Sequence, residues 1–196
     1  MGKDVKKALV IIDVQKDFCE GGVLPASDTF SLIEPLNDAI NWCVKNDILC
    51  VFTRDWHPVN HASFIEFGGT WKPHCVQGSE GAEFAEGLFI PGHSLIIDIE
   101  TDSNKLNTTY SAFENTNLES KLDRLGIKEI AAAGIATDYC VRATVLDALK
   151  YGFKCTVLTD MVRAIDVMEI DSIEALGEME DTGAKLLTSE EWMNVS

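Results

Sequence analysis

One cysteine stands where covalent chemistry is favoured. Residues 129–133 form an apolar run that leads through a glycine turn to Cys140, and helical periodicity begins at the next residue. A thiol at the start of a helix faces the positive end of the helix dipole, which favours the thiolate, and backbone N–H groups there can hold a developing oxyanion. Cys140 is therefore a candidate nucleophile, and an ordinary buried helical cysteine is the alternative.

A carboxylate is the candidate base. Asp13 directly follows the apolar run at residues 8–12. A carboxylate at the end of a buried strand must be paired, protonated or functional. A thiol nucleophile needs a proton acceptor, and a partly buried carboxylate with a raised pKa can serve as one. The alternative is an aspartate that caps the following loop.

Three further residues have the types that ligate a metal. Asp55 and His57 are two apart at the end of another apolar run, so strand alternation puts both side chains on one side. His74 lies across the irregular stretch that follows and can complete the set. One carboxylate and two imidazoles, without a thiolate, leave coordination positions for water and substrate. The alternative for each histidine is a surface or hydrogen-bonded loop residue.

The elements that must position these residues alternate along the chain, which is typical of βαβ units and a parallel sheet. The expected strands are nearly continuous apolar runs, as a sheet covered by helices on both faces requires. The sequence predicts an α/β fold, a doubly wound three-layer sandwich with a six-stranded parallel sheet. In such sheets ligands bind beyond the carboxyl ends of the strands. The expected strands cover residues 8–12, 48–52, 94–97, 129–133, 155–158 and 185–187.

Four helices are expected between the strands. The first runs to Val44 from a cap near Ser27 or Asp28, and the others cover residues 118–125, 141–149 and 168–179. Residues 56–92 have no clean period and hold three of the four histidines. Loops this long in a compact domain are usually functional. We therefore expect one domain over residues 1–196 with an irregular metal-binding loop region at about 56–92.

The charge and hydropathy of the chain limit the classes of molecule that it is expected to bind. The 196 residues include 32 acidic and 16 basic side chains, a formal charge of -16, which repels phosphate backbones and anionic lipid. No apolar run approaches the roughly 18 residues of a membrane span, and the first residues are polar. The six cysteines form no CxxC pair and are expected to be reduced. We expect a soluble cytoplasmic protein with a small-molecule substrate, with neither nucleic-acid nor membrane partners, and compatible with a homo-oligomer.

Five short motifs carry a resemblance that spans nearly the whole chain. They are DVQKDF at 13–18, TRDWHPVNH at 53–61, WKPHCV at 71–76, YSAF at 110–113 and GIATDYCVR at 134–142. In this order they resemble the nicotinamidase and pyrazinamidase branch of the isochorismatase-like hydrolases. The resemblance implies a six-stranded parallel sheet and a cysteine amidase. Its reaction would cleave nicotinamide, a linear carboxamide, to nicotinate and ammonia through a thioester.

The resemblance also implies roles for single residues. Cys140 would be the nucleophile and Asp13 its proton acceptor. The backbone N–H groups of Ala136 and Cys140 would form the oxyanion hole, with a cis peptide between Ile135 and Ala136. Lys105, the only lysine between residues 98 and 110, would be the third catalytic residue. It stands nearer Tyr110 than in many relatives, so a solvated loop lysine is the alternative.

A metal and a ring-binding wall complete what the resemblance implies. Asp55, His57 and His74 would hold one divalent metal, zinc before iron or manganese, which binds the pyridine nitrogen. His61, in the same loop, is a weaker candidate for a further ligand. The expected apolar walls for the ring are Phe18, Leu24, Trp71 and Tyr139.

Other functions stay open at this stage. A different amidase or carbamoyl hydrolase of the same superfamily would share the nucleophile, but such enzymes generally lack the aspartate and histidine set. A vinyl ether hydrolase is disfavoured because that branch does not use the cysteine found here at Cys140. A metal-binding homologue without turnover is the remaining alternative, which the position of Lys105 keeps open.

Overall fold

Six parallel strands form the centre of the molecule. The structure is a computed structural model that describes residues 6–99, 110–168 and 170–195. The order of the strands across the sheet is β3-β2-β1-β4-β5-β6, and every pair is parallel. The predicted α/β class and six-stranded sheet are therefore confirmed. The strands are β1 (Lys6–Ile12), β2 (Leu49–Asp55), β3 (Leu95–Ile99), β4 (Ile127–Ile135), β5 (Lys154–Arg163) and β6 (Lys185–Leu187).

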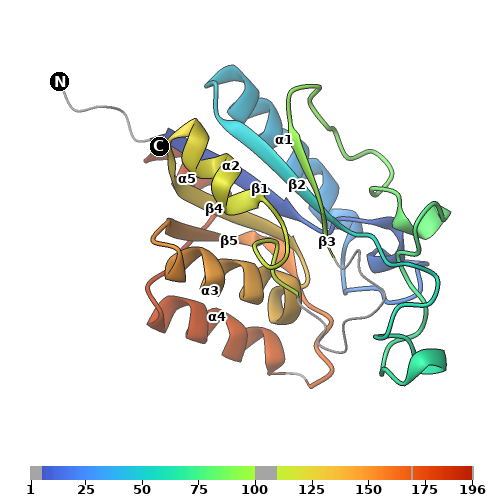
Figure 1. Ribbon diagram of the computed structural model, residues 1–196. Coiled ribbons are helices and arrows are strands. Elements are labelled where there is room, and N and C mark those ends of the chain that lie inside the picture. The colour runs from blue at the N-terminus through green and yellow to red at the C-terminus, as the bar shows by residue number, and fades with distance from the viewer. Residues whose placement is uncertain (1–5, 100–109, 169, 196) are drawn as a thin grey trace.

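Helices cover both faces of this sheet (Figure 1). Because neighbouring residues of a strand point to opposite faces, β1 contributes to two cores. Val10 and Ile12 pack with helices on one face, whereas Leu9 and Ile11 pack with helices on the other. The first face carries α2 (Leu118–Leu125), α3 (Arg142–Lys150) and α4 (Asp171–Asp181), and the second carries α1 (Ile33–Lys45) and α5 (Ser189–Asn194).

The first helix begins later than the sequence predicts. Instead of capping a helix, Asp28 has a left-handed backbone (φ 55°), and its carboxylate accepts a hydrogen bond from the Ser31 hydroxyl at 2.6 Å and lies 3.5 Å from the Arg163 guanidinium. The Ser27 N–H donates to the carbonyl of Ala164. A single 3-10 turn follows, and α1 begins at Ile33.

Two further differences concern the other helices. A π-helical turn, Thr137–Val141, precedes α3 and contains the candidate nucleophile, whereas the sequence predicts a helix from residue 141. The short helix α5 was not expected from periodicity. It is held by a capping box in which the Thr188 hydroxyl accepts from the Glu191 N–H and the Glu191 carboxylate accepts from the Thr188 N–H.

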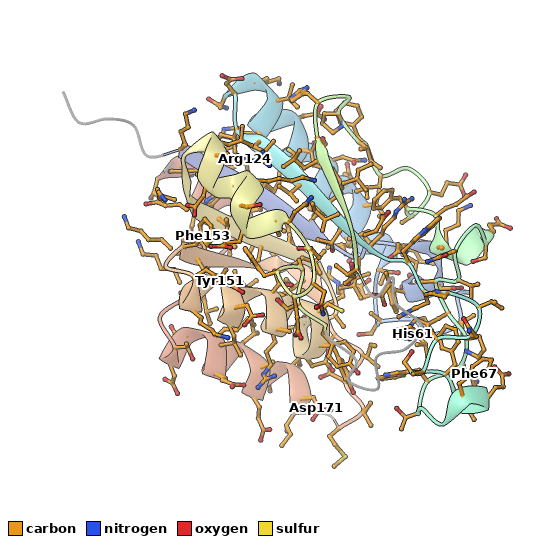
Figure 2. All side chains as sticks on the ribbon, in the orientation of Figure 1. His61, Phe67, Arg124, Tyr151, Phe153 and Asp171 are labelled. Carbon is orange, nitrogen blue, oxygen red and sulfur yellow. The ribbon has the colours of Figure 1, made fainter. Side chains whose placement is uncertain are left out.

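The sheet places the candidate site residues at one end of the molecule. β1 and β4 are the two central strands. After β1 the chain continues to β2 on one side, and after β4 it continues to β5 on the other. In a doubly wound fold the crevice lies beyond the carboxyl ends of the two strands where the direction changes in this way. Figure 2 shows His61 toward that end, whereas Arg124 and Tyr151 lie toward the other. Within the described part of the chain, no helix is long and apolar enough to cross a membrane.

Candidate active site

The carboxylate of Asp13 is fixed where β1 ends. Asp13 is fully buried and has a left-handed backbone (φ 49°). Its N–H donates to the Thr53 hydroxyl at 3.1 Å, and that hydroxyl donates to Asp13 Oδ1 at 2.6 Å. Because the hydroxyl accepts from the Asp13 N–H and donates its one proton to the carboxyl group, it contacts the residue at two points. Thr53 on β2 therefore sets the orientation of the candidate base.

Cys140 follows the neighbouring strand. β4 passes β1 so closely that a side chain at Gly134 (φ 117°) would have its Cβ 2.1 Å from the carbonyl oxygen of Ile12. The peptide between Ile135 and Ala136 is cis, as the resemblance implies. The N–H groups of Tyr139 and Val141 then both donate to the Ala136 carbonyl, at 3.1 and 3.0 Å. The turn buries Cys140 to 6 % exposure beside Ala136.

One pocket brings most of the predicted residues together. Both Ala136 and Cys140 line it. The predicted ring walls Phe18, Leu24, Trp71 and Tyr139 and the predicted metal ligands Asp55, His57 and His74 line it as well. Three lining residues were not predicted from the sequence: Ser63, Tyr110 and Ile165.

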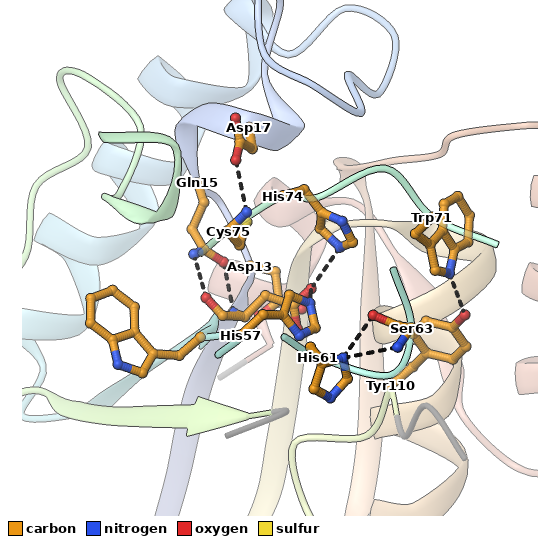
Figure 3. Close-up of polar contacts among 12 residues, drawn as sticks. Asp13, Gln15, Asp17, His57, His61, Ser63, Trp71, His74, Cys75 and Tyr110 are labelled. Atoms are coloured by element: carbon orange, nitrogen blue, oxygen red, sulfur yellow. Dashed lines mark hydrogen bonds and ion pairs between the residues drawn. The ribbon is translucent and has the colours of Figure 1, made fainter. Parts of the chain in front are cut away.

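Aromatic side chains form a connected wall of this pocket. The Trp71 indole N–H donates to the Tyr110 hydroxyl at 3.1 Å (Figure 3). The Tyr139 ring meets Trp71 and Tyr110 edge-on, with ring centroids 5.4 and 5.3 Å away. Such edge-to-face contacts stabilise the arrangement of the rings beyond simple burial. Lys105, the predicted third catalytic residue, lies outside the described residues.

The predicted metal ligands converge in the structure. Asp55 Oδ2 lies 3.3 Å from His57 Nε2 and 3.7 Å from His74 Nε2. The potential ligand atoms of the three residues all lie within 4.8 Å of one another, and all three side chains are buried. Burial disfavours the charged carboxylate, but the adjacent imidazoles of His57 and His74 outweigh this and lower the pKa of Asp55 below its ordinary value. The carboxylate is therefore held in the ionised form that ligates metals.

The hydrogen bonds of the histidine ring nitrogens show which of these atoms are available to bind a metal. His74 Nδ1 lies 2.7 Å from the Lys72 carbonyl, which can only accept, so in the neutral ring Nε2 carries the lone pair. Among the described residues, neither ring nitrogen of His57 makes a hydrogen bond, although both are buried, and Nε2 faces the Asp55 carboxylate at 3.3 Å. Buried polar atoms normally have partners, and a divalent ion would supply one here. The donor set of two imidazoles and one carboxylate suits zinc, iron or manganese.

His61 lies beside this set. It is fully buried, and its ring centroid is 4.5 Å from that of His57. The Ser63 hydroxyl lies 2.7 Å from His61 Nδ1, and the Ser63 N–H donates to the same nitrogen at 3.3 Å. Nδ1 is thus occupied by hydrogen bonds within the loop. The geometric cluster of ligand atoms comprises Asp55, His57 and His74, without His61.

The irregular segment is anchored to the strand ends by long-range hydrogen bonds. The His57 N–H donates to the Cys75 carbonyl at 3.0 Å, so the two candidate histidine ligands sit on adjacent backbone segments. The carboxylate of Asp17 accepts from the Cys75 N–H at 2.7 Å (Figure 3). Gly81 packs directly on that carboxylate, because a Cβ there would lie 2.1 Å from Asp17 Oδ2.

Sequence reasoning missed two of these anchors. Asp17 holds the segment next to His74, and Gln15 is fully buried and bonds to the backbone of Asp55. A signal was present, because Asp13, Gln15 and Asp17 are polar at every second position immediately after a buried strand. The chain has left the strand here, with a left-handed backbone at Asp13 and Asp17 in a 3-10 turn. The signal is therefore the presence of polar residues beyond the carboxyl end of the strand, where ligands bind in such sheets.

Comparisons with known proteins agree with this geometry. A family model described as "Isochorismatase domain" matches residues 7–191. The nicotinamidase of Escherichia coli strain K12 is 36 % identical over 207 residues, covering 95 % of this chain and 96 % of that protein. The crystal structure of the pyrazinamidase of Pyrococcus horikoshii in complex with zinc has a TM-score of 0.88 and 43 % identity, covering 93 % of this chain and 99 % of that one. That of PnC1 from L. infantum in complex with nicotinate has a TM-score of 0.83 and 35 % identity, covering 96 % and 95 %.

The doubly wound α/β sheet, with a buried cysteine and a buried carboxylate at its central crevice, and the matches to these relatives define a hydrolase that acts on a carboxamide. The chain belongs to the isochorismatase-like hydrolases and, within them, to the nicotinamidase branch.

Proposed function

We propose that this chain is a nicotinamidase, a cysteine amidase that hydrolyses nicotinamide to nicotinate and ammonia. The observation that carries the proposal is that Cys140 and the cluster of Asp55, His57 and His74 open onto one small, largely aromatic pocket. A nicotinamide molecule has a carboxamide, which Cys140 can attack, and a pyridine nitrogen, which a metal held by the cluster can bind. The likeness to the E. coli nicotinamidase and to a structure with bound nicotinate supports the same substrate.

The residues at the strand ends perform the covalent chemistry. Asp13 takes the proton of the Cys140 thiol, and the thiolate adds to the carboxamide carbon. The backbone N–H groups of Ala136 and Cys140 hold the oxyanion. When the C–N bond breaks, ammonia leaves with the proton from Asp13, and a thioester to Cys140 remains. Asp13 then deprotonates a water that hydrolyses the thioester, which releases nicotinate and returns the proton to the thiol.

Lys105 is proposed as the third catalytic residue. An ammonium beside Asp13 and Cys140 would favour the thiolate and lower the pKa of the carboxyl group, which opposes the effect of burial. A lysine suits this position because its flexible stem lets one charge reach both groups from a loop.

The remaining pocket residues hold the substrate. Asp55, His57 and His74 would bind one divalent ion, with zinc favoured by the archaeal relative and iron or manganese compatible with the same donors. When bound, the ion supplies a Lewis-acid site for the pyridine nitrogen. Phe18, Leu24, Trp71 and Tyr139 pack against the ring and exclude water from it.

One assay tests the proposal. Purified protein is incubated with nicotinamide, and ammonia release is measured before chelation, after chelation, and after zinc, iron or manganese is added back. We expect stoichiometric nicotinate and ammonia, loss of activity on chelation and recovery with metal. No ammonia release at full metal occupancy would support the non-catalytic homologue. Turnover of a carbamoyl substrate in preference to nicotinamide would support the other amidase branch.

A further inference from the structure

The side chain of Gln15 occupies the seam between the candidate base and the candidate metal site. It lies two residues after Asp13, is fully buried and is among the side chains drawn with their polar contacts in Figure 3. The mechanism proposed above does not use it. A buried carboxamide costs free energy unless its donors and its acceptor are satisfied, so its partners define its role.

All the polar atoms of this carboxamide bond to backbone groups of the site. Its oxygen accepts from the Asp55 N–H at 2.8 Å. Its nitrogen donates to the Asp55 carbonyl at 2.8 Å and to the Ala82 carbonyl at 2.9 Å. One side chain therefore holds both backbone groups of the residue that supplies the metal-site carboxylate. We call these three hydrogen bonds the Gln15 bridge.

The Gln15 bridge takes the place of backbone pairing that β1 does not provide to Asp55. Pairing between β1 and β2 ends at Ile11 and Phe52, so β1 provides no backbone partner for Asp55. On the other side of β2, pairing with β3 continues to Asp55 and Ile99. The Gln15 carboxamide presents a donor and an acceptor to Asp55 in the way that a further residue of β1 would. The carboxylate of Asp55 is thus aimed by a side chain rather than by the sheet alone.

The third hydrogen bond, to the Ala82 carbonyl, links Gln15 to the segment near His74. Ala82 belongs to the same 3-10 turn as Gly81, which packs on the Asp17 carboxylate. Asp17 in turn accepts from the N–H of Cys75, the neighbour of His74. The Gln15 bridge therefore connects the Asp55 backbone to the segment that carries the second histidine.

We propose that Gln15 is a positioning residue for metal binding, which it promotes by fixing Asp55 relative to His57 and His74. This inference rests on the metal site of the proposed function. Residues that orient metal ligands by hydrogen bonds typically contribute about tenfold to a hundredfold in metal affinity or activity. Thr53, the corresponding contact two residues earlier on β2, bonds to Asp13 and not to a ligand. Gln15 therefore acts on metal binding, and Thr53 acts on proton transfer.

The test compares zinc affinity in matched variants. Gln15→Met keeps the length of the side chain and removes all three hydrogen bonds, whereas Gln15→Glu replaces the donor by an oxygen that faces two carbonyls. Gln77→Met is the control, because Gln77 donates to the Trp56 carbonyl at 2.9 Å from an exposed position beside the same loop. Apo proteins are titrated with zinc against a chromophoric chelator, and folding is followed by circular dichroism and thermal unfolding.

We expect both Gln15 variants to remain folded and to bind zinc about tenfold to a hundredfold more weakly than the wild type, while Gln77→Met stays within about twofold. Excess zinc is expected to restore most of the turnover of Gln15→Met. A role in stability alone would instead lower the midpoint of thermal unfolding and leave the zinc affinity of the folded protein unchanged.

The outcomes separate this inference from the proposed function. A wild type that binds no zinc, iron or manganese would overturn the metal assignment and the inference together. A wild type that binds zinc, with Gln15 variants that bind it equally well, would overturn only the inference. If neither Gln15 variant folds even with zinc present, the inference is also overturned, because Gln15 would then determine the fold rather than the metal site.

Discussion

Different kinds of structure hold the two sides of the site. The nucleophile side has the candidates Asp13 and Cys140, and the metal side has the candidate ligands Asp55, His57 and His74. Asp13 directly follows β1, and Cys140 follows β4 after one short turn, so the hydrogen-bonded ladder of the sheet sets their separation. On the metal side, Asp55 ends β2, but His57 and His74 belong to a segment with little regular structure. Side chains, mainly Gln15 and Asp17, hold that segment against the strand ends.

This difference suggests that the two sides fail in different ways. A substitution on the nucleophile side removes a reacting group or its orientation and leaves the metal in place. A substitution on the metal side weakens the binding of an ion, which an excess of that ion can offset by mass action. Four predictions test this division, beginning with the largest expected effect.

Replacing the nucleophile has the largest expected effect. Cys140→Ala should lower kcat by several orders of magnitude with full metal occupancy and a nearly unchanged fold, because the covalent route is removed. Cys19→Ala is the control, since Cys19 does not line the pocket. Near-normal turnover by Cys140→Ala would place the nucleophile elsewhere.

Alkylation gives a second measurement of the same residue. Burial raises the pKa of Cys155 to about 12, so that thiol is almost entirely protonated at pH 8. We expect iodoacetamide to modify Cys140 first, with loss of activity in proportion, as followed by peptide mass spectrometry. Inactivation that follows modification of Cys19 instead would contradict the assignment.

Removing a ligand should empty the metal site. Asp55→Ala and His57→Ala are each expected to lose stoichiometric metal and most of the activity, as measured by elemental analysis of the purified proteins. His61→Ala is the comparison, because His61 lies outside the cluster of ligand atoms. It should keep the metal. Full occupancy in either ligand variant would refute the site.

A smaller loss is expected at the proposed third catalytic residue. Lys105→Ala should lower kcat/KM at least a hundredfold, about 2.7 kcal/mol of transition-state stabilisation, and retain the metal. Lys121→Ala, on α2, serves as the control and should change little. Equal behaviour of the two variants would mean that the third residue is supplied from outside residues 98–110.

The smallest predicted effect concerns the orientation of the base. Thr53→Val removes the hydroxyl that bonds to both the N–H and the carboxylate of Asp13. We expect a fall in kcat of roughly tenfold at unchanged zinc affinity, smaller than the hundredfold or more that a general acid–base group itself contributes, because Asp13 is still present. Thr144→Val is the matched control, because that buried hydroxyl accepts from the Ala112 N–H and contacts neither group. A loss that excess zinc repairs would contradict the division between the two sides.

Sequence patterns predicted the sheet well because its strands are buried on both faces. A short, nearly continuous apolar run such as residues 8–12 is typical of a strand in a parallel sheet that is covered on both faces. A polar residue directly after the run marks the end of the strand. The start of α1 was wrong because the Asp28 carboxylate lies near the Arg163 guanidinium, a partner 135 residues away in the sequence. Local spacing carries no information about such a partner.

The same limit applies to the candidate site. Asp13, Asp55 and Cys140 were predicted because each stands next to a recognisable strand. The bonds from Gln15 to Ala82 and from Asp17 to Cys75 span 67 and 58 residues and were missed. The polar residues after β1 are visible in the sequence, but they do not reveal which backbone groups the side chains reach.

The contact at Gly134 has a consequence for how this protein can be varied. The atom that a larger residue would meet is the backbone of Ile12, which cannot move aside without separating β1 from β4. Alanine, the smallest replacement, would therefore push the ends of these strands apart and carry Asp13, the proposed base, away from Cys140. A library for altered substrate preference can therefore vary the aromatic wall, but it should keep glycine at this position, although Gly134 does not line the pocket.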